Sequence, residues 1–242
     1  AASYDCAMCG RFTYRYRWQQ LAKLMRLIRW PDVELAPRFN VAPTQPAPVV
    51  RTGTDGVRES IMLRWGLVPH WTHDLAIGNR HINARSETVE SKPAFRGPFR
   101  DQRCIVPVSS FYEWRLLRDG KTKQPYSIGR DDGEPFYLAG LWDRTTIEGE
   151  PLDSFTILTT SPNALMSPLH DRMPVLVAES DVDRWLDPKP LSHPERDRLL
   201  QPSPMQGFEA VPVGRLVNSP KLDSPDLLIP VPEPDQKDGF LF

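Results

Sequence analysis

The sequence predicts an α+β fold: a single β-rich domain with a strongly curved or barrel-like mixed sheet system and a few peripheral helices. Three observations lead to this prediction. The chain of 242 residues contains 26 prolines, about twice the usual share, which favours turns over long helices. Its apolar runs are short and bounded by Pro, Gly or Asp, as strands are. Helical periodicity is restricted to two short segments.

The clearer helical pattern lies in residues 18–30, WQQLAKLMRLIRW. Its apolar side chains recur at helical spacing: Trp18, Leu21, Met25 and Ile28. This spacing predicts an amphipathic helix that ends before Pro31. A second helix is expected near Ser180, because SDVDRWL begins with a capping residue and continues with early acids.

Strands of about four to eight residues are expected in the apolar runs. These runs are APVVRT (47–52), IMLRWGLVP (61–69), RCIVPVSSFYEW (103–114), PFYLAGLW (135–142), SFTILTT (154–160) and MPVLVA (173–178). No internal repeat and no long linker separates them. We therefore expect one domain over residues 8–232, preceded by an extension or expression remnant (1–7) and followed by a polar tail (233–242).

Charge and cysteine content narrow the class of protein. The net charge of −1 gives no global attraction to polyanions, so a nucleic-acid site must depend on local clustering. Cys6, Cys9 and Cys104 form no even disulfide framework, which indicates a reducing compartment. The sequence shows neither a signal peptide nor an apolar run long enough for a membrane span. We expect a cytoplasmic, monomeric protein.

One local cluster of positive charge does occur. Between Gly10 and Pro31 there are six Lys or Arg residues and no acid, and RFTYRYRW interleaves arginine with aromatic residues. This interleaving suits phosphate contacts and base stacking. The basic residues inside the expected helix are better explained as its solvated face, whereas Arg11 is a candidate for DNA binding.

Common enzyme motifs are missing. The sequence contains no HExxH, no glycine-rich phosphate loop after a strand and no GxSxG. Cys6 and Cys9 form a lone CxxC, which is weak support for a metal or redox site. His70, His73 and His81 could nominate a metal site, but solvated surface histidines are the simpler interpretation. We expect no metal and no cofactor.

Two segments place polar residues in constrained positions. INARSE puts Asn83, Arg85 and Glu87 on one face if the segment is extended. SPLHDRMP holds His170 and Arg172 between two prolines. Each has a simpler reading, since Asn83 could satisfy a turn and His170 could cap a strand.

SFYEWR places Glu113 between two aromatic residues. Desolvation there would raise the pKa of its carboxyl and make it a proton donor and acceptor near neutral pH. Pairing with an arginine at a sheet edge is the alternative. Together with Cys9, these segments supply a nucleophile, an amide, a carboxyl and an imidazole, which suit acid/base-assisted covalent chemistry.

The order of eight segments resembles a known family. MCGRF, RFNVAPTQ, RWGLVPHW, NARSET, PVSSFYEW, FTILTT, LHDRMPV and VNSPKLDSPDLL match the SOS response-associated peptidase (SRAP) family from Met8 to about Pro232. The resemblance implies a single α+β domain that binds single-stranded DNA. It also implies a covalent bond to abasic sites through the cysteine that follows the initiator methionine.

The resemblance also implies roles for individual residues. The reactive cysteine corresponds to Cys9, and its partners correspond to Asn83, Glu113 and His170. The phosphate-binding arginines correspond to Arg11, Arg85 and Arg172, and the lining of the DNA path to Asn40 and Trp114.

The residue types fit this chemistry. An α-amine with a pKa of about 7.7–8.0 is largely neutral near that pH and can attack the aldehyde of an abasic deoxyribose to give an imine. The adjacent thiol then closes a thiazolidine ring, which only a terminal cysteine can do. Glu113 would move protons during ring opening and imine formation. His170 could assist ring opening, and Asn83 could orient the amine.

The sequence places AASYDCA before Met8, so Cys9 carries a peptide bond in this form of the chain. With those residues present the protein could bind DNA but could not form the thiazolidine. A further alternative is that Cys9 cleaves the preceding bond itself. The main expectation is a DNA-damage (SOS response) protein that crosslinks to abasic sites in single-stranded DNA, a lyase-like activity. The alternatives are a thiol-dependent (auto)peptidase, a hydrolase using Cys9 and His170, and a non-covalent single-strand binder.

Overall fold

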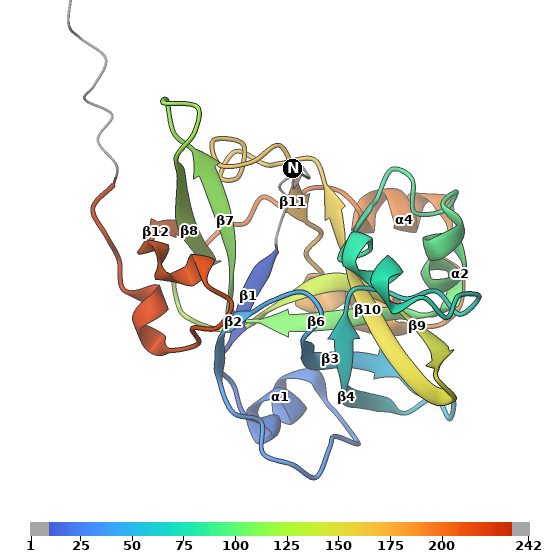
Figure 1. The fold of residues 1–242 in the computed structure, drawn as a ribbon. Coiled ribbons are helices and arrows are strands. Elements are labelled where there is room, and N and C mark those ends of the chain that lie inside the picture. The colour runs from blue at the N-terminus through green and yellow to red at the C-terminus, as the bar shows by residue number, and fades with distance from the viewer. Residues whose placement is uncertain (1–9, 234–242) are drawn as a thin grey trace, which may run out of the picture.

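The computed structural model describes residues 10–233, and its strands form two sheets (Figure 1). Five strands close into a barrel in the order β10, β4, β3, β6, β9, because β9 pairs with both β6 and β10. Their bounds are β3 (Pro46–Thr52), β4 (Arg58–Trp65), β6 (Arg103–Val108), β9 (Phe136–Ile147) and β10 (Glu150–Thr160).

Two short strands extend the barrel along β10, namely β5 (Asn83–Arg85) and β11 (Met173–Pro174). β10 runs parallel to β4 and β5, whereas its pairs with β9 and β11 are antiparallel. The barrel is therefore mixed, as the sequence predicts.

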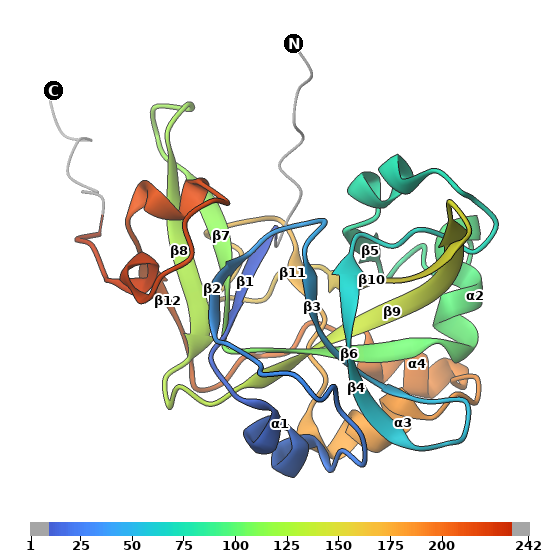
Figure 2. The same ribbon diagram turned by 60° about the horizontal axis from the view of Figure 1, so that its bottom comes forward.

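The second sheet is antiparallel and has the order β12, β8, β7, β1, β2. Its strands are β1 (Arg11–Tyr14), β2 (Arg38–Val41), β7 (Ser110–Leu116), β8 (Lys123–Arg130) and β12 (Phe208–Pro212). A single residue, Ser109, separates β6 of the barrel from β7 of this sheet, so the chain passes directly from one sheet to the other (Figure 2). The predicted α+β class with a strongly curved sheet system is confirmed.

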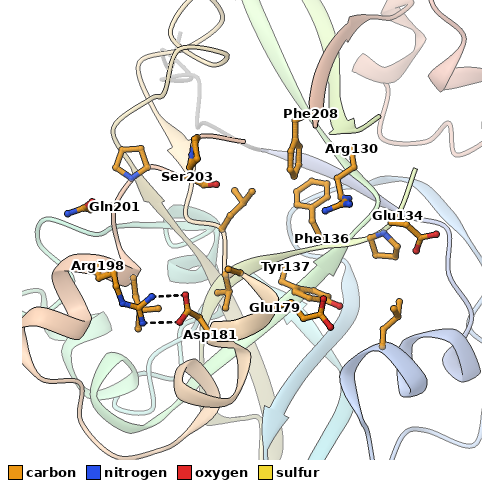
Figure 3. A pocket seen from close by; sticks show the side chains of 18 residues that line it. Arg130, Glu134, Phe136, Tyr137, Glu179, Asp181, Arg198, Gln201, Ser203 and Phe208 are labelled. Carbon is orange, nitrogen blue, oxygen red and sulfur yellow. Dashed lines mark hydrogen bonds and ion pairs between the residues drawn. The ribbon is translucent and has the colours of Figure 1, made fainter. Parts of the chain in front are cut away.

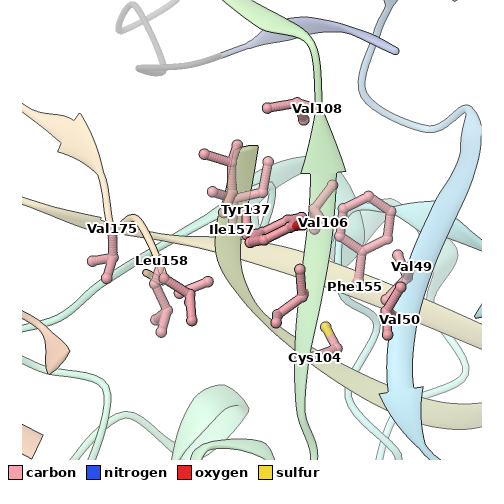
Figure 4. Close-up of a cluster of buried hydrophobic side chains, with 14 of the residues drawn as sticks. Val49, Val50, Cys104, Val106, Val108, Tyr137, Phe155, Ile157, Leu158 and Val175 are labelled. Atoms are coloured by element: carbon pink, nitrogen blue, oxygen red, sulfur yellow. The ribbon is translucent and has the colours of Figure 1, made fainter. Parts of the chain in front are cut away.

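Buried aliphatic and aromatic side chains fill the barrel and the space between the sheets (Figure 4). Val106, Ile157 and Leu158 are fully buried, and burying a side chain of this size stabilises the fold by about 1.5–3 kcal/mol. Phe12 of β1 packs on Trp65 of β4 with ring centroids 4.9 Å apart. This contact joins the second sheet to the barrel.

Helices are short and lie outside the sheets (Figure 2). They are α1 (Trp18–Met25), α2 (Pro93–Asp101), α3 (Val182–Leu186) and α4 (His193–Leu199), with 3-10 turns η1 (Leu75–Arg80), η2 (Glu179–Asp181), η3 (Arg215–Asn218) and η4 (Pro225–Leu228). Within residues 10–233 no helix has the length and apolar character needed to cross a membrane.

The helix expected over residues 18–30 is shorter than predicted. It ends at Met25 because Arg26 adopts a left-handed conformation with φ 51°. After this cap, Ile28 donates its backbone N–H to the carbonyl of Arg58 at 3.0 Å, and its side chain is 69% exposed. The bonding available at the edge of β4 therefore replaces the last helical turn.

Three other expectations need correction. In MPVLVA only Met173–Pro174 forms a strand. Val175 nevertheless donates its N–H to Leu158 of β10 and accepts from Ala139 of β9, and Val177 donates to Tyr137 of β9.

A helix does start near Ser180, since the η2 turn covers Glu179–Asp181 and α3 follows from Val182, but Ser180 is not its cap: the N-cap of α3 is Asp181, which makes no side-chain capping bond. The remaining apolar runs contain strands as predicted, but β9 and β10 are longer than expected, with 12 and 11 residues.

Candidate functional site

Strand β1 places the residue that follows Cys9 beside the carboxyl predicted to be catalytic. Cys9 and Cys6 lie outside the described residues, and the description starts at Gly10. Arg11 pairs with Tyr112 across the antiparallel β1–β7 ladder, so Glu113 lies at the level of Gly10. Glu113 is fully buried, and its Oε1 accepts the backbone N–H of Trp114 at 3.0 Å.

A segment near the end of the described chain, residues 217–222, closes over β1 and β2. Asn40 is fully buried and donates from Nδ2 to the carbonyl oxygens of Val217 (3.2 Å), Ser219 (2.9 Å) and Leu222 (2.9 Å). Its Oδ1 accepts from Arg11 Nη1 at 2.9 Å. Asn40 therefore holds the 217–222 segment against the strand that follows Cys9.

Arg11 and Trp114 attach to the same segment. Arg11 Nη1 donates to the carbonyl of Val217 at 2.9 Å, and Trp114 Nε1 donates to Oδ1 of Asn218 at 2.8 Å. Within residues 10–233 the hydrogen-bond partners of Arg11 are all uncharged. Burial lowers the pKa of the Arg11 guanidinium, as expected for a cation taken from water without an acid beside it.

The barrel supplies a second group of predicted residues. Asn83 pairs with Ile157, and Arg85 pairs with Thr159 in the parallel β5–β10 ladder. Ala84 between them is buried and Arg85 is exposed, which is the alternation of a strand at the rim of a barrel. Asn83 and Arg85 thus share one face, as predicted.

Glu87 does not continue that face. The strand ends at Arg85, and the chain turns because Ser86 donates its N–H to the carbonyl of Thr159 at 2.8 Å and Thr88 donates to that of Arg85 at 3.1 Å. Glu87 lies in this turn. The expectation that all three polar side chains lie on one strand face is wrong for Glu87.

His170 lies in the loop between β10 and β11, with a side chain that is 16% exposed. Its backbone N–H donates to the carbonyl of Met166 at 2.9 Å, and its Nδ1 accepts the backbone N–H of Arg172 at 3.1 Å. In the neutral ring the proton is then on Nε2. The exposed carboxylate of Asp171, 2.8 Å from Nδ1, can pair with the ring when it is protonated.

Arg172 is held from two directions. Its Nη1 and Nη2 donate to the two carboxylate oxygens of Glu87 at 2.6 and 2.9 Å, a bidentate pair. Nη2 also donates to the backbone carbonyl of Thr159 at 2.7 Å and to its Oγ1 at 3.2 Å. The hydrogen bond from Arg172 lowers the pKa of Glu87.

The two groups lie at the same end of the molecule. Phe12 packs on Trp65, and Trp65 Nε1 donates to the carbonyl of Ile82 at 2.9 Å, directly before Asn83. Figures 1 and 2 both show the start of β1 beside β11, between β7 and the end of β10. We use the name opening for this end of the molecule, where the elements meet that carry Arg11, Asn40, Glu113, Trp114, Asn83, Arg85, His170 and Arg172.

A separate cleft of about 540 Å³ lies elsewhere, between β8, β9 and the segment that follows α4 (Figure 3). Phe136, Tyr137 and Phe208 line it, and Arg198 and Asp181 form a bidentate ion pair at its wall. None of the predicted site residues that the structure describes lines this cleft.

The three histidines considered for a metal site are not gathered around one point. Each bonds through Nδ1 to a different partner: His70 to Asp143 (3.0 Å), His73 to the carbonyl of Thr146 (2.8 Å) and His81 to that of Leu67 (3.2 Å). Within residues 10–233 no group of three or more His, Cys, Asp or Glu side chains is arranged to hold a metal ion.

Cys104 is fully buried in the barrel, and burial raises the pKa of its thiol far above the usual range. A thiol that stays protonated is a poor nucleophile. Among the described residues, therefore, there is no reactive cysteine.

Sequence reasoning missed two features of the opening. Asn218 and the carbonyl oxygens of the 217–222 segment complete one wall, yet backbone acceptors have no signature in the sequence. The pairing of Glu87 with Arg172 joins residues 85 positions apart. Opposite charge alone could have suggested that pair, but the sequence offers many other combinations of an acid with an arginine.

Comparison with known proteins now identifies the family. The family model described as "SOS response associated peptidase (SRAP)" matches residues 8–220. The chain belongs to the SRAP family.

Relatives in this family align with most of the chain. It is 43% identical over 224 residues to "Abasic site processing protein YoqW" of Bacillus subtilis (strain 168), covering 91% of this chain and 99% of that protein. It is 31% identical over 227 residues to "Abasic site processing protein HMCES" of Gallus gallus, covering 81% of this chain and 66% of that protein. A crystal structure of a protein from Bacteroides thetaiotaomicron superimposes with a TM-score of 0.80 at 28% identity, covering 92% of this chain and all of that one.

Proposed function

We propose that this SRAP protein processes abasic sites in single-stranded DNA by forming a covalent thiazolidine link through Cys9, which shields the lesion from strand cleavage. Relatives that share 43% and 31% of their aligned residues with the chain are named abasic site processing proteins. The eight residues named at the opening carry the polar groups that such a reaction requires.

One observation carries the proposal: a fully buried carboxyl, Glu113, lies at the level of Gly10. Cys9 is joined to Gly10 by a peptide bond, which limits the separation of their Cα atoms to about 3.8 Å. A group that exchanges protons is thus supported within reach of the residue proposed to react. Geometry of this kind is the first requirement for general acid/base catalysis.

The proposed reaction forms an imine first and closes the ring second. The neutral α-amine of Cys9 attacks C1′ of the ring-opened deoxyribose, and the carbinolamine loses water to give an imine. Loss of water leaves the imine nitrogen protonated; the thiol sulfur then adds to the imine carbon as the thiol gives up its proton, which closes the neutral thiazolidine. Glu113 gives a proton to the departing water and accepts the one released by the thiol.

His170 and Asn83 assist on the other side of the opening. With Nδ1 of His170 occupied by the Arg172 N–H, Nε2 is the nitrogen that can exchange a proton with the sugar during ring opening. Asn83 orients the amine. This arrangement acts only when Cys9 is terminal, so residues 1–8 must be absent from the reacting form.

Positive charge around the opening would bind the strand. Arg85 is exposed on the barrel rim, Arg172 pairs with Glu87 in the turn that follows the same strand, and Arg11 begins β1 on the sheet side. We assign phosphate contacts to these three arginines and base stacking to Trp114, with Asn40 shaping the path through the 217–222 segment. Single-stranded DNA would then bind before the covalent step.

A peptidase is the second candidate, because the family description contains that word. It would use the thiol of Cys9 with His170 as base, and turnover of a peptide would distinguish it from the crosslinking reaction. A non-covalent single-strand binder is the third, and it would not need an aldehyde on the DNA.

The test uses protein that begins at Cys9 and a single-stranded oligonucleotide with one abasic site. We expect a denaturation-resistant adduct of summed mass minus one water, and none with undamaged DNA or with protein that retains residues 1–8. Cys9→Ser should lose the stable adduct while keeping an imine that borohydride traps. Cys104→Ala is the matched control and should react normally. Equal stable adduct from Cys9→Ser would refute ring closure.

A further inference from the structure

The guanidinium proposed to bind a phosphate already holds an anion. Both terminal nitrogens of Arg172 donate to the carboxylate of Glu87, at 2.6 and 2.9 Å. A carboxylate and a phosphate present oxygen pairs of similar spacing, and arginine binds either through the same two N–H groups. Glu87 thus occupies the position that a DNA phosphate would take.

Arg172 cannot easily offer another edge. Its Nη2 is tied to the carbonyl and hydroxyl of Thr159, a residue that is 3% exposed. Its Nε is buried and has no hydrogen-bond partner within residues 10–233. The edge formed by Nη1 and Nη2, where Glu87 binds, is therefore the one that a ligand from solvent can reach.

Glu87 has room to leave. Its side chain is 50% exposed and belongs to the turn after β5 rather than to a paired strand. A cleft of about 470 Å³ lies beside it, lined by Glu90, Arg196 and Gln201 among others. A carboxylate displaced from Arg172 could enter this cleft without movement of the barrel.

We propose that Glu87 is a specificity-determining residue: its carboxylate competes with DNA phosphates for Arg172 and weakens non-covalent binding of every strand. This rests on the proposed function. An undamaged strand must displace Glu87 and gains only reversible contacts, so it dissociates readily. A strand with an abasic site must also displace Glu87 from Arg172, but the covalent bond to Cys9 then retains it. Competition between Glu87 and DNA phosphates therefore increases the ratio of damaged to undamaged DNA that is bound to the protein.

The chain contains a matched control for this idea. Glu90 lies in the same turn and lines the same cleft, and its side chain is 52% exposed, but it pairs with Arg196. Glu87→Gln and Glu90→Gln remove the same charge from nearly the same place. Only the first should free Arg172.

The experiment measures Kd for a fluorescent, undamaged single-stranded oligonucleotide by anisotropy at fixed salt. We expect Glu87→Gln to bind about 5-fold more tightly, the scale of one exposed ion pair, and Glu90→Gln to stay within about 2-fold. In an Arg172→Ala background, Glu87→Gln should have no more effect than Glu90→Gln. Thermal melting confirms that each variant is folded.

The outcomes separate the two proposals. If the unaltered protein binds the strand but Glu87→Gln matches Glu90→Gln, binds more weakly, or keeps its full effect without Arg172, then competition by Glu87 is wrong and the proposed function stands. If neither the unaltered protein nor any variant binds single-stranded DNA, both are wrong.

Discussion

The two sides of the opening are built differently. On the sheet side, Asn40 and Glu113 are fully buried, and Asn40 contacts four different residues through its amide. On the barrel side, Arg85 is exposed on a strand of three residues, and Arg172 is paired with a half-exposed carboxylate. Buried groups that are hydrogen-bonded keep a fixed geometry, whereas a half-exposed carboxylate such as that of Glu87 can leave its partner at little cost.

This difference indicates a division of labour. Covalent chemistry needs reacting atoms held to within a fraction of an ångström, and the sheet side can supply that. Binding a flexible strand of any sequence needs charges that adapt to different phosphate positions, which suits the exposed Arg85 and the exchangeable carboxylate of Glu87 on the barrel side. The following predictions test the comparison, starting with the largest expected effect.

Glu113→Gln should slow adduct formation by about 100-fold or more, because it keeps the size of the side chain but removes its exchangeable acid. Affinity for undamaged single-stranded DNA should be unchanged, since a buried side chain makes no phosphate contact. Quenched time courses and anisotropy measure the two quantities. Glu209→Gln, on the exposed face of β12 in the same sheet, is the control and should alter neither.

The comparison would fail if Glu113→Gln unfolded or lost affinity yet crosslinked at the normal rate once bound. Glu113 would then be structural, and His170 would become the leading candidate for proton transfer.

Asn40→Ala should lower the free energy of unfolding by about 2 kcal/mol, because several buried carbonyl groups lose their donor. Arg85→Ala on the barrel side should change it by less than about 0.5 kcal/mol, as exposed substitutions usually do. Urea unfolding monitored by tryptophan fluorescence gives both values. Equal losses from the two variants would contradict the contrast between a fixed side and an adaptable one.

The smallest effect concerns Glu87 and pH. Arg172 holds the pKa of Glu87 below its usual 4.5 in the folded protein. The pair therefore stabilises the fold above the unfolded pKa, and this contribution is lost as pH falls through the lowered value. At pH 7 the unaltered protein should be more stable than Glu87→Gln by less than about 1 kcal/mol.

That difference in stability should disappear in acid, below the pKa of the folded carboxyl. Melting temperatures of both proteins across the acid range provide the measurement. A difference that grew on acidification would show that Glu87 does not form a stabilising pair.

Local patterns predicted most of the fold, and non-local bonding explains the exceptions. Alternating or continuous apolar runs such as SFTILTT contain strands because their partners only reinforce a local preference. The helix over residues 18–30 ends early since the edge of β4 offers Ile28 a backbone partner. MPVLVA forms so short a strand because its bonds are divided between β9 and β10. The sequence of residues 18–30 does not reveal the partner in β4, and the sequence of MPVLVA does not reveal the partners in β9 and β10.

The candidate site shows the same limit. Residues could be nominated from their neighbours in the sequence, and the register of β1 with β7 places Glu113 near Gly10. The hydrogen-bond partners of the predicted site residues could not be predicted, because they are distant in the sequence. Arg172 pairs with Glu87, and Asn40 donates to three carbonyl groups more than 170 positions away. The proposed roles of Cys9, Asn83, Glu113 and His170 stay predictions until the adduct is measured.

The bonds that close the sheet side also set an order in time. Arg11 and its acceptor Val217 are 206 positions apart. The ribosome therefore synthesises Arg11 long before Val217. A nascent chain carries Cys9 and Glu113 while the 217–222 segment does not yet exist, and contacts of such sequence separation form late in folding. We expect an interrupted or truncated chain to display its cysteine without the wall that Asn40 secures, so that reactivity toward damaged DNA belongs to finished molecules.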